Sequence, residues 1–165
     1  MMSQPLAERL RPKTLDDYIG QKHLVGQGAV LRKMIDAGRV PSFILWGPPG
    51  VGKTTLAQII ANKLDAPFYT LSAISSGVKD VREVIEKAKS NRFFNTVSPI
   101  LFIDEIHRFS KSQQDSLLNA VETGVVTLIG ATTENPSFEV IRPLLSRCQV
   151  YVLKSLDKND LLTLL

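Results

Sequence analysis

The chain has 165 residues, 44 % of them hydrophobic and 22 % charged, which suits one globular domain with one sizeable core. No apolar run approaches the length of a membrane span, residues 1–12 lack the apolar stretch of a secretory signal, and the single cysteine, Cys148, excludes a disulfide framework and favours a reducing cytosol. The net charge of +4 is compatible with a nucleic-acid partner, but solvated basic faces give the same balance.

Apolar segments rich in strand-forming residues alternate along the chain with helical patterns. Most of these apolar segments are continuous, as expected for strands buried on both faces of a parallel sheet. The alternation predicts right-handed crossovers and a three-layer α/β domain with five parallel strands. In chain order, the expected elements are a helix over 28–37, a strand over 42–46, a helix over 53–64, a strand over 67–71, a helix over 78–90, a strand over 99–104, a helix over 111–122 and strands over 125–132 and 148–153.

The two ends of the chain differ from this alternating pattern. Residues 1–22 precede the first expected strand and helix pair as an N-terminal arm. The last segment, SLDKNDLLTLL, begins with possible helix caps at Ser155 or Asp157 and ends on apolar residues with no stop signal. We therefore expect a core over 23–154 and the start of a second, truncated domain over 155–165.

The segment GPPGVGKT joins the strand expected over 42–46 to the helix expected over 53–64. Its glycines allow backbone N–H groups to close around phosphates, and the positive end of the following helix faces the same anion. Lys53 can reach the terminal phosphates of a nucleotide, the Thr54 hydroxyl can ligate Mg²⁺, and Thr55 is expected near the inner phosphates. A Gly-Pro turn without a ligand is the plain alternative. The predicted phosphate-binding residues are Gly47, Pro48, Pro49, Gly50, Val51, Gly52, Lys53, Thr54 and Thr55.

Two acidic residues end the strand expected over 99–104, in the segment ILFIDEIH. At the carboxyl edge of a parallel sheet, Asp104 can hold Mg²⁺ through water and Glu105 can orient the attacking water. An exposed acidic turn is the plain alternative, but a phosphate-binding loop without a metal-holding acid would be incomplete. The two motifs together predict hydrolysis of ATP or GTP with Mg²⁺.

The glutamate directly after the aspartate, together with GPPGVGKT, resembles the AAA+ ATPases, which implies ATP as the nucleotide. The segment RLRPKTLDDYIGQ (9–21) resembles the one that precedes the phosphate loop in clamp-loader subunits and in the Holliday-junction branch-migration motor, where it wraps the adenine. This resemblance implies that residues 1–22 form an adenine-binding arm; the alternative is a plain amphipathic arm. The implied base-pocket residues are Leu10, Arg11, Pro12, Tyr18 and Ile19.

Two motifs near the end of the chain carry the same resemblance. LIGATTEN (128–135) is similar to the sensor-1 strand of these ATPases, which implies that Thr133 hydrogen-bonds the γ-phosphate or the attacking water. Thr132 is nearly as good a candidate, because adjacent strand residues point to opposite faces, and a satisfied strand threonine is the plain alternative for either. LLSRCQVY (144–151) resembles the clamp-loader arginine finger, which implies that Arg147 acts on the nucleotide of a neighbouring subunit. A surface ion pair is the plain alternative for Arg147.

At a finer level, PLAERLRPKTLDDYIGQ, DEIHRF, GATTENPSFEV and LLSRCQVY are similar to the replication-associated recombination protein A family, from about residue 5 to 156. This resemblance implies a P-loop NTPase (AAA+) core followed by a helical lid, of which 155–165 would be the start. It also implies a cytoplasmic, nucleoid-associated homo-oligomer, a DNA-dependent ATPase at stalled or gapped replication forks, with single-strand-binding protein as a candidate partner. A nucleotide-gated scaffold with little turnover is one alternative. A relative of the branch-migration motor is another, although VETGVVTLIGATT leaves little room for the β-hairpin of that motor.

Contacts with DNA are expected from the two helices that correspond to the inner surface of clamp loaders. Any phosphate contacts there would carry no sequence specificity. Solvated helix faces are an equally good interpretation of the same residues. The candidates are Lys79, Arg82, Arg108 and Lys111, whereas His107 is read as a buried, hydrogen-bonded histidine with no catalytic role.

Overall fold

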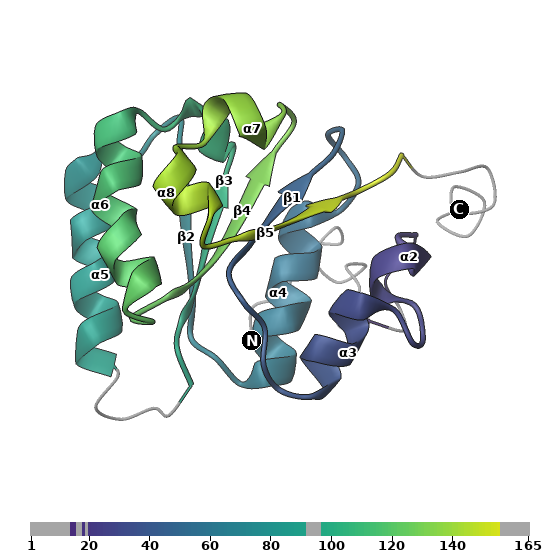
Figure 1. The fold of residues 1–165 in the computed structure, drawn as a ribbon. Helices are drawn as coiled ribbons and strands as arrows, with labels where there is room; N and C mark the ends of the chain where they lie inside the picture. Colours follow the sequence, from purple (N-terminus) through teal and green to yellow (C-terminus); the bar gives the residue numbers. More distant parts are fainter. Residues whose placement is uncertain (1–13, 16–17, 19, 92–96, 156–165) are drawn as a thin grey trace, which may run out of the picture.

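A computed structural model describes residues 14–15, 18, 20–91 and 97–155 of the chain (Figure 1). Five strands form one parallel sheet: β1 (Phe43–Trp46), β2 (Phe68–Ser72), β3 (Ile100–Asp104), β4 (Thr127–Thr132) and β5 (Gln149–Val152). Their order across the sheet is β2-β3-β4-β1-β5, so β1 lies between the two strands that come last in the chain. In the register, Phe43 of β1 stands beside Ile129 of β4 on one side and Gln149 of β5 on the other. The predicted five-stranded parallel sheet is confirmed.

Helices cover both faces of this sheet and complete the three layers that the sequence predicts (Figure 1). On one face lie α3 (Val30–Asp36) and α4 (Lys53–Leu64), and on the other α5 (Val78–Asn91), α6 (Lys111–Glu122) and α8 (Arg142–Leu145). The short helix α2 (Lys22–Val25) precedes α3, so the predicted arm boundary at residue 22 falls at the start of a helix. In the part of the chain that the structure describes, no helix is both long and apolar enough to cross a membrane.

The core consists of two apolar clusters separated by the sheet. Alternate residues of β1 serve different clusters: Phe43 and Leu45 pack with α3 and α4, and Ile44 packs with α5, α6 and α8. The central strands β1, β3 and β4 are buried on both faces, as predicted from their continuous apolar sequences. The edge strands differ, because each has a neighbour on one side only. Val150 and Val152 of β5 keep 39 % and 50 % of their surface exposed.

Four short helical segments were not predicted: α2, the 3₁₀ helix η1 (Ile106–Arg108), α7 (Pro136–Glu139) and α8. None exceeds four residues, so none can show a helical repeat of apolar positions. Their signals are local instead. In α7, the Asn135 side chain accepts a hydrogen bond of 3.0 Å from the Ser137 N–H, and Pro136 occupies the first helical position.

Candidate nucleotide-binding site

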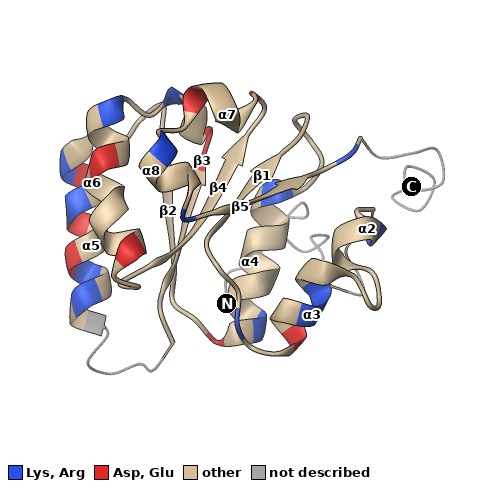
Figure 2. Ribbon diagram, in the orientation of Figure 1, with Lys and Arg blue, Asp and Glu red and all other residues tan. Residues whose placement is uncertain are grey.

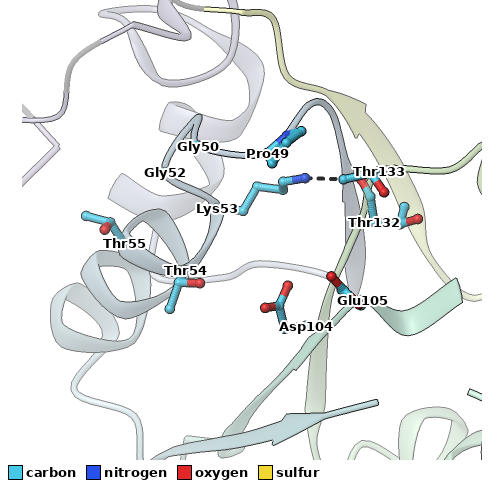
Figure 3. Close-up of a pocket in the computed structure, with 10 residues that line it drawn as sticks. All are labelled: Pro49, Gly50, Gly52, Lys53, Thr54, Thr55, Asp104, Glu105, Thr132 and Thr133. Carbon is cyan, nitrogen blue, oxygen red and sulfur yellow. Dashed lines mark hydrogen bonds between the residues drawn. The ribbon is translucent and has the colours of Figure 1, made fainter. Parts of the chain in front are cut away.

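A cavity of about 410 Å³ opens at the carboxyl edge of the sheet (Figure 3). Three segments that are far apart in the sequence meet there: the loop between β1 and α4 with the start of α4, the end of β3, and the end of β4. Ligand sites of open α/β sheets lie at this edge. The lining residues are Pro49, Gly50, Gly52, Lys53, Thr54, Thr55, Asp104, Glu105, Thr132 and Thr133.

Glycines give the loop between β1 and α4 its path around the cavity. Gly50 and Gly52 have φ angles of 79° and 88°, in the left-handed region that other residues rarely adopt. Gly47 is needed for space, since a Cβ there would lie 2.8 Å from the Leu153 carbonyl oxygen. Gly47 and two other predicted phosphate-binding residues, Pro48 and Val51, are absent from the lining; Val51 is buried in the core instead. These three shape the loop rather than face the cavity.

The Lys53 ammonium group lies inside the cavity and contacts only backbone oxygens among the hydrogen bonds of the described residues. Its Nζ donates to the Gly47 carbonyl at 2.6 Å. It also donates to the Thr132 carbonyl at 3.2 Å, the dashed line in Figure 3. Burial lowers the pKa of Lys53, while the nearby carboxylates of Asp104 and Glu105 act in the opposite direction. Neutral carbonyls are weaker partners for a cation than phosphate oxygens are, so an entering phosphate can take their place.

Helix α4 begins at the cavity and points its N-terminus toward it. Gly52 caps the helix with no side chain that could occupy the first N–H groups. These donors and the positive end of the helix dipole are therefore available to an anion. Lys53, Thr54 and Thr55, in the first turn of the 12-residue helix, all line the cavity. The sequence prediction of a phosphate-binding helix start fits this geometry.

The two acidic residues lie side by side at the end of β3. Asp104 is the last residue of the strand and is exposed, and Glu105 follows with a left-handed φ of 53°. Among the described residues, no three His, Cys, Asp or Glu side chains cluster to hold a metal ion by themselves. A Mg²⁺ ion there would need ligands from the nucleotide as well as from Asp104 and Thr54, which is how Mg²⁺ is usually held beside phosphates.

An ion pair not foreseen from the sequence involves Glu105. The Arg108 Nε lies 2.8 Å from Glu105 Oε2, and the arginine side chain is 59 % exposed. This oxygen is itself buried and accepts no aligned hydrogen bond from the described residues, so the contact is a charge contact without hydrogen-bond geometry. The i, i+3 spacing of the two residues in DEIHR was the available signal, because η1 brings them to the same side of one turn.

The two threonines at the end of β4 have different surroundings. Thr132 is buried, and its hydroxyl lies 2.9 Å from His107 Nδ1 while accepting a 2.9 Å hydrogen bond from the Glu134 N–H. Thr133 is exposed and lines the cavity. Both threonines line the cavity, and Thr133 is the exposed one of the two. Its role as a sensor stays a prediction.

Tyr18 is the one described residue of the predicted base pocket. Its hydroxyl lies 2.9 Å from the Val51 carbonyl oxygen and 3.0 Å from that of Gly52, and these hydrogen bonds stabilise the phosphate loop. Burial raises the pKa of Tyr18 to about 12, which keeps this hydroxyl a donor. Tyr18 also borders a second cavity of about 420 Å³ beside α2 and α3. The other predicted base-pocket residues, Leu10, Arg11, Pro12 and Ile19, lie outside the described residues, as do residues 156–165 of the segment expected to begin a lid.

Arg147 does not join the other predicted catalytic residues. It follows α8, is not among the residues that line the cavity, and has a side chain that is 56 % exposed. Its Nε lies 3.9 Å from Glu122 Oε1, a long surface ion pair. Arg147 therefore lies outside the residues that line the phosphate site of its own chain. Its action on a neighbouring subunit stays a prediction.

The basic residues predicted to contact DNA lie on the side of the sheet covered by α5 and α6. Lys and Arg alternate with Asp and Glu along α5 (Figure 2), so Lys79 and Arg82 stand on a helix of mixed charge. Arg108 and Lys111 are exposed near the start of α6. These four residues alone do not form a strongly basic stripe.

Comparisons with known proteins show the family to which the chain belongs. A family model for the ATPase family associated with various cellular activities (AAA) matches residues 43–156, and the chain belongs to this family. Replication-associated recombination protein A of Haemophilus influenzae is 55 % identical over 157 residues, 95 % of this chain and 35 % of that protein. The ATPase WRNIP1 of Dictyostelium discoideum is 53 % identical over 161 residues, 98 % of this chain and 18 % of that protein. These similarities confirm the resemblance to the replication-associated recombination protein A family.

The fold is shared with a solved branch migration motor. The RuvB Holliday junction branch migration motor of Thermotoga maritima superimposes with a TM-score of 0.70 at 34 % identity, over 88 % of this chain and 48 % of that one. This similarity and the AAA match confirm the predicted three-layer P-loop NTPase core. The chain spans about a third of the length of the Haemophilus influenzae protein and about half of the Thermotoga maritima one.

Proposed function

We propose that this chain is the ATPase core of a Mg²⁺-dependent ATP hydrolase that is stimulated by DNA and acts at stalled or gapped replication forks. The observation that carries the proposal is the convergence of Lys53, Asp104 and Glu105 on one cavity at the start of α4. Membership of the AAA family and similarity to replication-associated recombination proteins support it.

Each residue around the cavity has a distinct part in the proposed reaction. The loop N–H groups and Lys53 hold the phosphates, and Thr54 with Asp104 would hold Mg²⁺, which neutralises phosphate charge when bound. Glu105 orients a water molecule for attack on the terminal phosphorus, and Thr133 is placed to hydrogen-bond that phosphate or that water. Arg147 does not line this cavity, so we assign it to the site of a neighbouring subunit in a homo-oligomer.

Glu105→Gln is expected to separate ATP binding from hydrolysis. The amide keeps the shape of the side chain but cannot accept a proton from water, so we expect turnover to fall by roughly 100-fold or more while ATP still binds. Equilibrium binding of labelled ATP and steady-state phosphate release measure the two steps. Failure of the variant to bind Mg²⁺·ATP would give Glu105 a structural role instead.

The ion pair between Arg108 and Glu105 suggests how DNA could act on the proposed site. A DNA phosphate that binds the exposed guanidinium of Arg108 would compete with the Glu105 carboxylate for it. Released from this partner, Glu105 is free to orient water. The contacts of Lys79, Arg82 and Lys111 would add affinity without sequence specificity.

Arg108→Gln is therefore expected to raise ATP turnover without DNA and to reduce the stimulation by DNA. The rise should not exceed about fivefold, because exposed ion pairs contribute about 0.2–1 kcal/mol. Lys89→Gln is the matched control, since Lys89 forms an i, i+3 ion pair of 3.4 Å with Glu86 on α5, away from the cavity. ATP turnover measured with and without gapped DNA tests this; a lower rate without DNA would mean that Arg108 supports Glu105 rather than restrains it.

The same assay in the full-length protein separates the proposal from its alternatives. DNA-stimulated turnover supports the hydrolase, and nucleotide binding with negligible turnover under every condition supports a scaffold for replication proteins, with single-strand-binding protein as a candidate partner. The similarity to RuvB makes branch migration the other alternative. Only residues 123–126 separate α6 from β4, which supports the prediction that an inserted hairpin is missing here. If the protein moved a synthetic Holliday junction, branch migration would replace the proposed action at replication forks.

A further inference from the structure

A hydrogen bond outside the phosphate loop connects two sides of the cavity. One side carries the acidic residues Asp104 and Glu105, and the other carries the predicted sensor residue Thr133. His107 Nδ1, in η1, lies 2.9 Å from the Thr132 hydroxyl at the end of β4. The two residues are 25 positions apart in the chain. Thr132 is 1 % exposed, and a buried hydroxyl of this kind needs hydrogen-bond partners within the protein.

The Thr132 hydroxyl has a full set of partners that fix its position. It accepts the Glu134 N–H at 2.9 Å, and its own proton can go to the Glu134 carbonyl at 3.0 Å or to His107 Nδ1. An imidazole nitrogen is a donor in one tautomer and an acceptor in the other, so His107 completes either arrangement. The backbone carbonyl of Thr132 simultaneously receives Lys53 Nζ at 3.2 Å.

The short turn that carries His107 also sets the direction of Glu105. Glu105 is the N-terminal cap of η1 and has one of the three left-handed, non-glycine conformations among the described residues. Such a conformation costs about 1–3 kcal/mol and persists only where neighbouring contacts hold it. Ile106, which is fully buried, packs so closely on β4 that a Cβ on Gly130 would lie 3.1 Å from its Cδ1. η1 is thus fixed to β4 at two points, Ile106 on Gly130 and His107 on Thr132.

We infer that His107 is a positioning residue for ATP hydrolysis: through the Thr132 hydroxyl it fixes Glu105 relative to Lys53 and to the strand end that bears Thr133. The inference rests on the proposed hydrolase function. His107 is half-buried rather than buried as predicted, it is hydrogen-bonded as predicted, and it does not line the cavity. Its effect is on the placement of Glu105, so it should act on the hydrolytic step and not on ATP affinity.

Paired substitutions in the full-length protein test the inference. His107→Ala and Thr132→Val each remove one partner, and each should lower kcat by roughly 10- to 100-fold, the effect of a displacement of about 1 Å. The Kd for ATP should change by less than about threefold, because the phosphate loop is untouched. The double variant should be no slower than the slower single variant, since both changes break the same contact.

Conservative variants distinguish positioning from a general loss of packing. His107→Asn keeps a polar atom near the place of Nδ1 and Thr132→Ser keeps the hydroxyl, so both should recover most of the lost kcat. In a Glu105→Gln background, His107→Ala should cause no further loss. Multiplied losses in the double variant, an equal loss of ATP affinity, or His107→Asn as slow as His107→Ala would each overturn the inference.

A spectroscopic measurement covers variants that fold poorly and separates this inference from the proposed function. The ¹⁵N resonances of the His107 ring should shift on Thr132→Ser less than on Thr132→Val, while those of His23, the other histidine of this chain, should not move. Unchanged His107 resonances in both variants would contradict the contact. Absence of ATP turnover in the unmodified protein would refute the proposed hydrolase, whereas normal turnover in His107→Ala would refute only the positioning role.

Discussion

Replacing Lys53 by alanine is expected to lower kcat/KM for ATP by roughly 1,000-fold while leaving the fold intact. The variant loses both a charge-assisted contact with the phosphates in the ground state and charge stabilisation in the transition state. The structural cost is small, because within the described part of the chain the ammonium group donates hydrogen bonds only to the Gly47 and Thr132 carbonyl oxygens. The Thr132 carbonyl keeps a second donor, the Gly47 N–H at 3.1 Å. We expect the free energy of unfolding to change by less than about 1 kcal/mol.

ATP binding, turnover and thermal unfolding of the purified full-length variant check this expectation together. Lys63→Ala is the matched control, because Lys63 stands in the last turn of the same helix and does not line the cavity. It removes the same charge from α4 without touching the phosphate site. Normal turnover in Lys53→Ala, or an equal loss in Lys63→Ala, would contradict the assignment of the phosphate site.

Arg147→Ala is expected to lower turnover by about 1,000-fold or more while ATP binding is largely kept. An arginine that acts on the nucleotide of a neighbouring subunit stabilises charge that develops on the terminal phosphate only during reaction. The exposed position of Arg147, away from the cavity of its own chain, is compatible with that action. Turnover and ATP affinity of the full-length oligomer provide the measurement.

Two further samples decide whether Arg147 acts in trans. Glu122→Ala removes the partner of Arg147 within the chain, so it should have little effect unless the 3.9 Å ion pair is the whole role of the arginine. Mixing Arg147→Ala with Lys53→Ala subunits should restore part of the activity, because one subunit supplies an intact site and the other an intact arginine. A mixture that stays inactive despite demonstrated subunit exchange would count against the trans role.

The long elements of the fold could be predicted because each carries its own signal. Helices α4 and α6 begin and end where the sequence places them, at 53–64 and 111–122, since the phosphate loop and the Ser110 capping box mark their starts. The central strands are continuously apolar because both of their faces are buried. The expected strand ends differ from the observed ones by no more than two residues.

Contacts that depend on the folded arrangement could not be predicted in this way. The alternation of strand faces separates Thr132 from Thr133 but does not say which hydroxyl is held by hydrogen bonds, because the Thr132 partners, His107 and Glu134, come from η1 and the loop after β4. The partners of Arg108 and His107 are set by a three-residue turn that has no periodic pattern. Motifs thus identified the phosphate and acidic residues, while the residues that support them became visible only in three dimensions.

The central position of β1 has a consequence for the synthesis of the chain. Both strands that pair with β1 are made much later: β4 begins at residue 127 and β5 at residue 149. At roughly 5–20 residues per second, a ribosome takes about 4–16 s to add the roughly 80 residues between β1 and β4. During that interval the apolar segment Phe43–Trp46 has neither of its native strand neighbours and is a target for chaperones or for aggregation. Because Lys53 and Gly47 both contact Thr132, the nucleotide pocket is among the last parts of this core that a nascent chain can assemble.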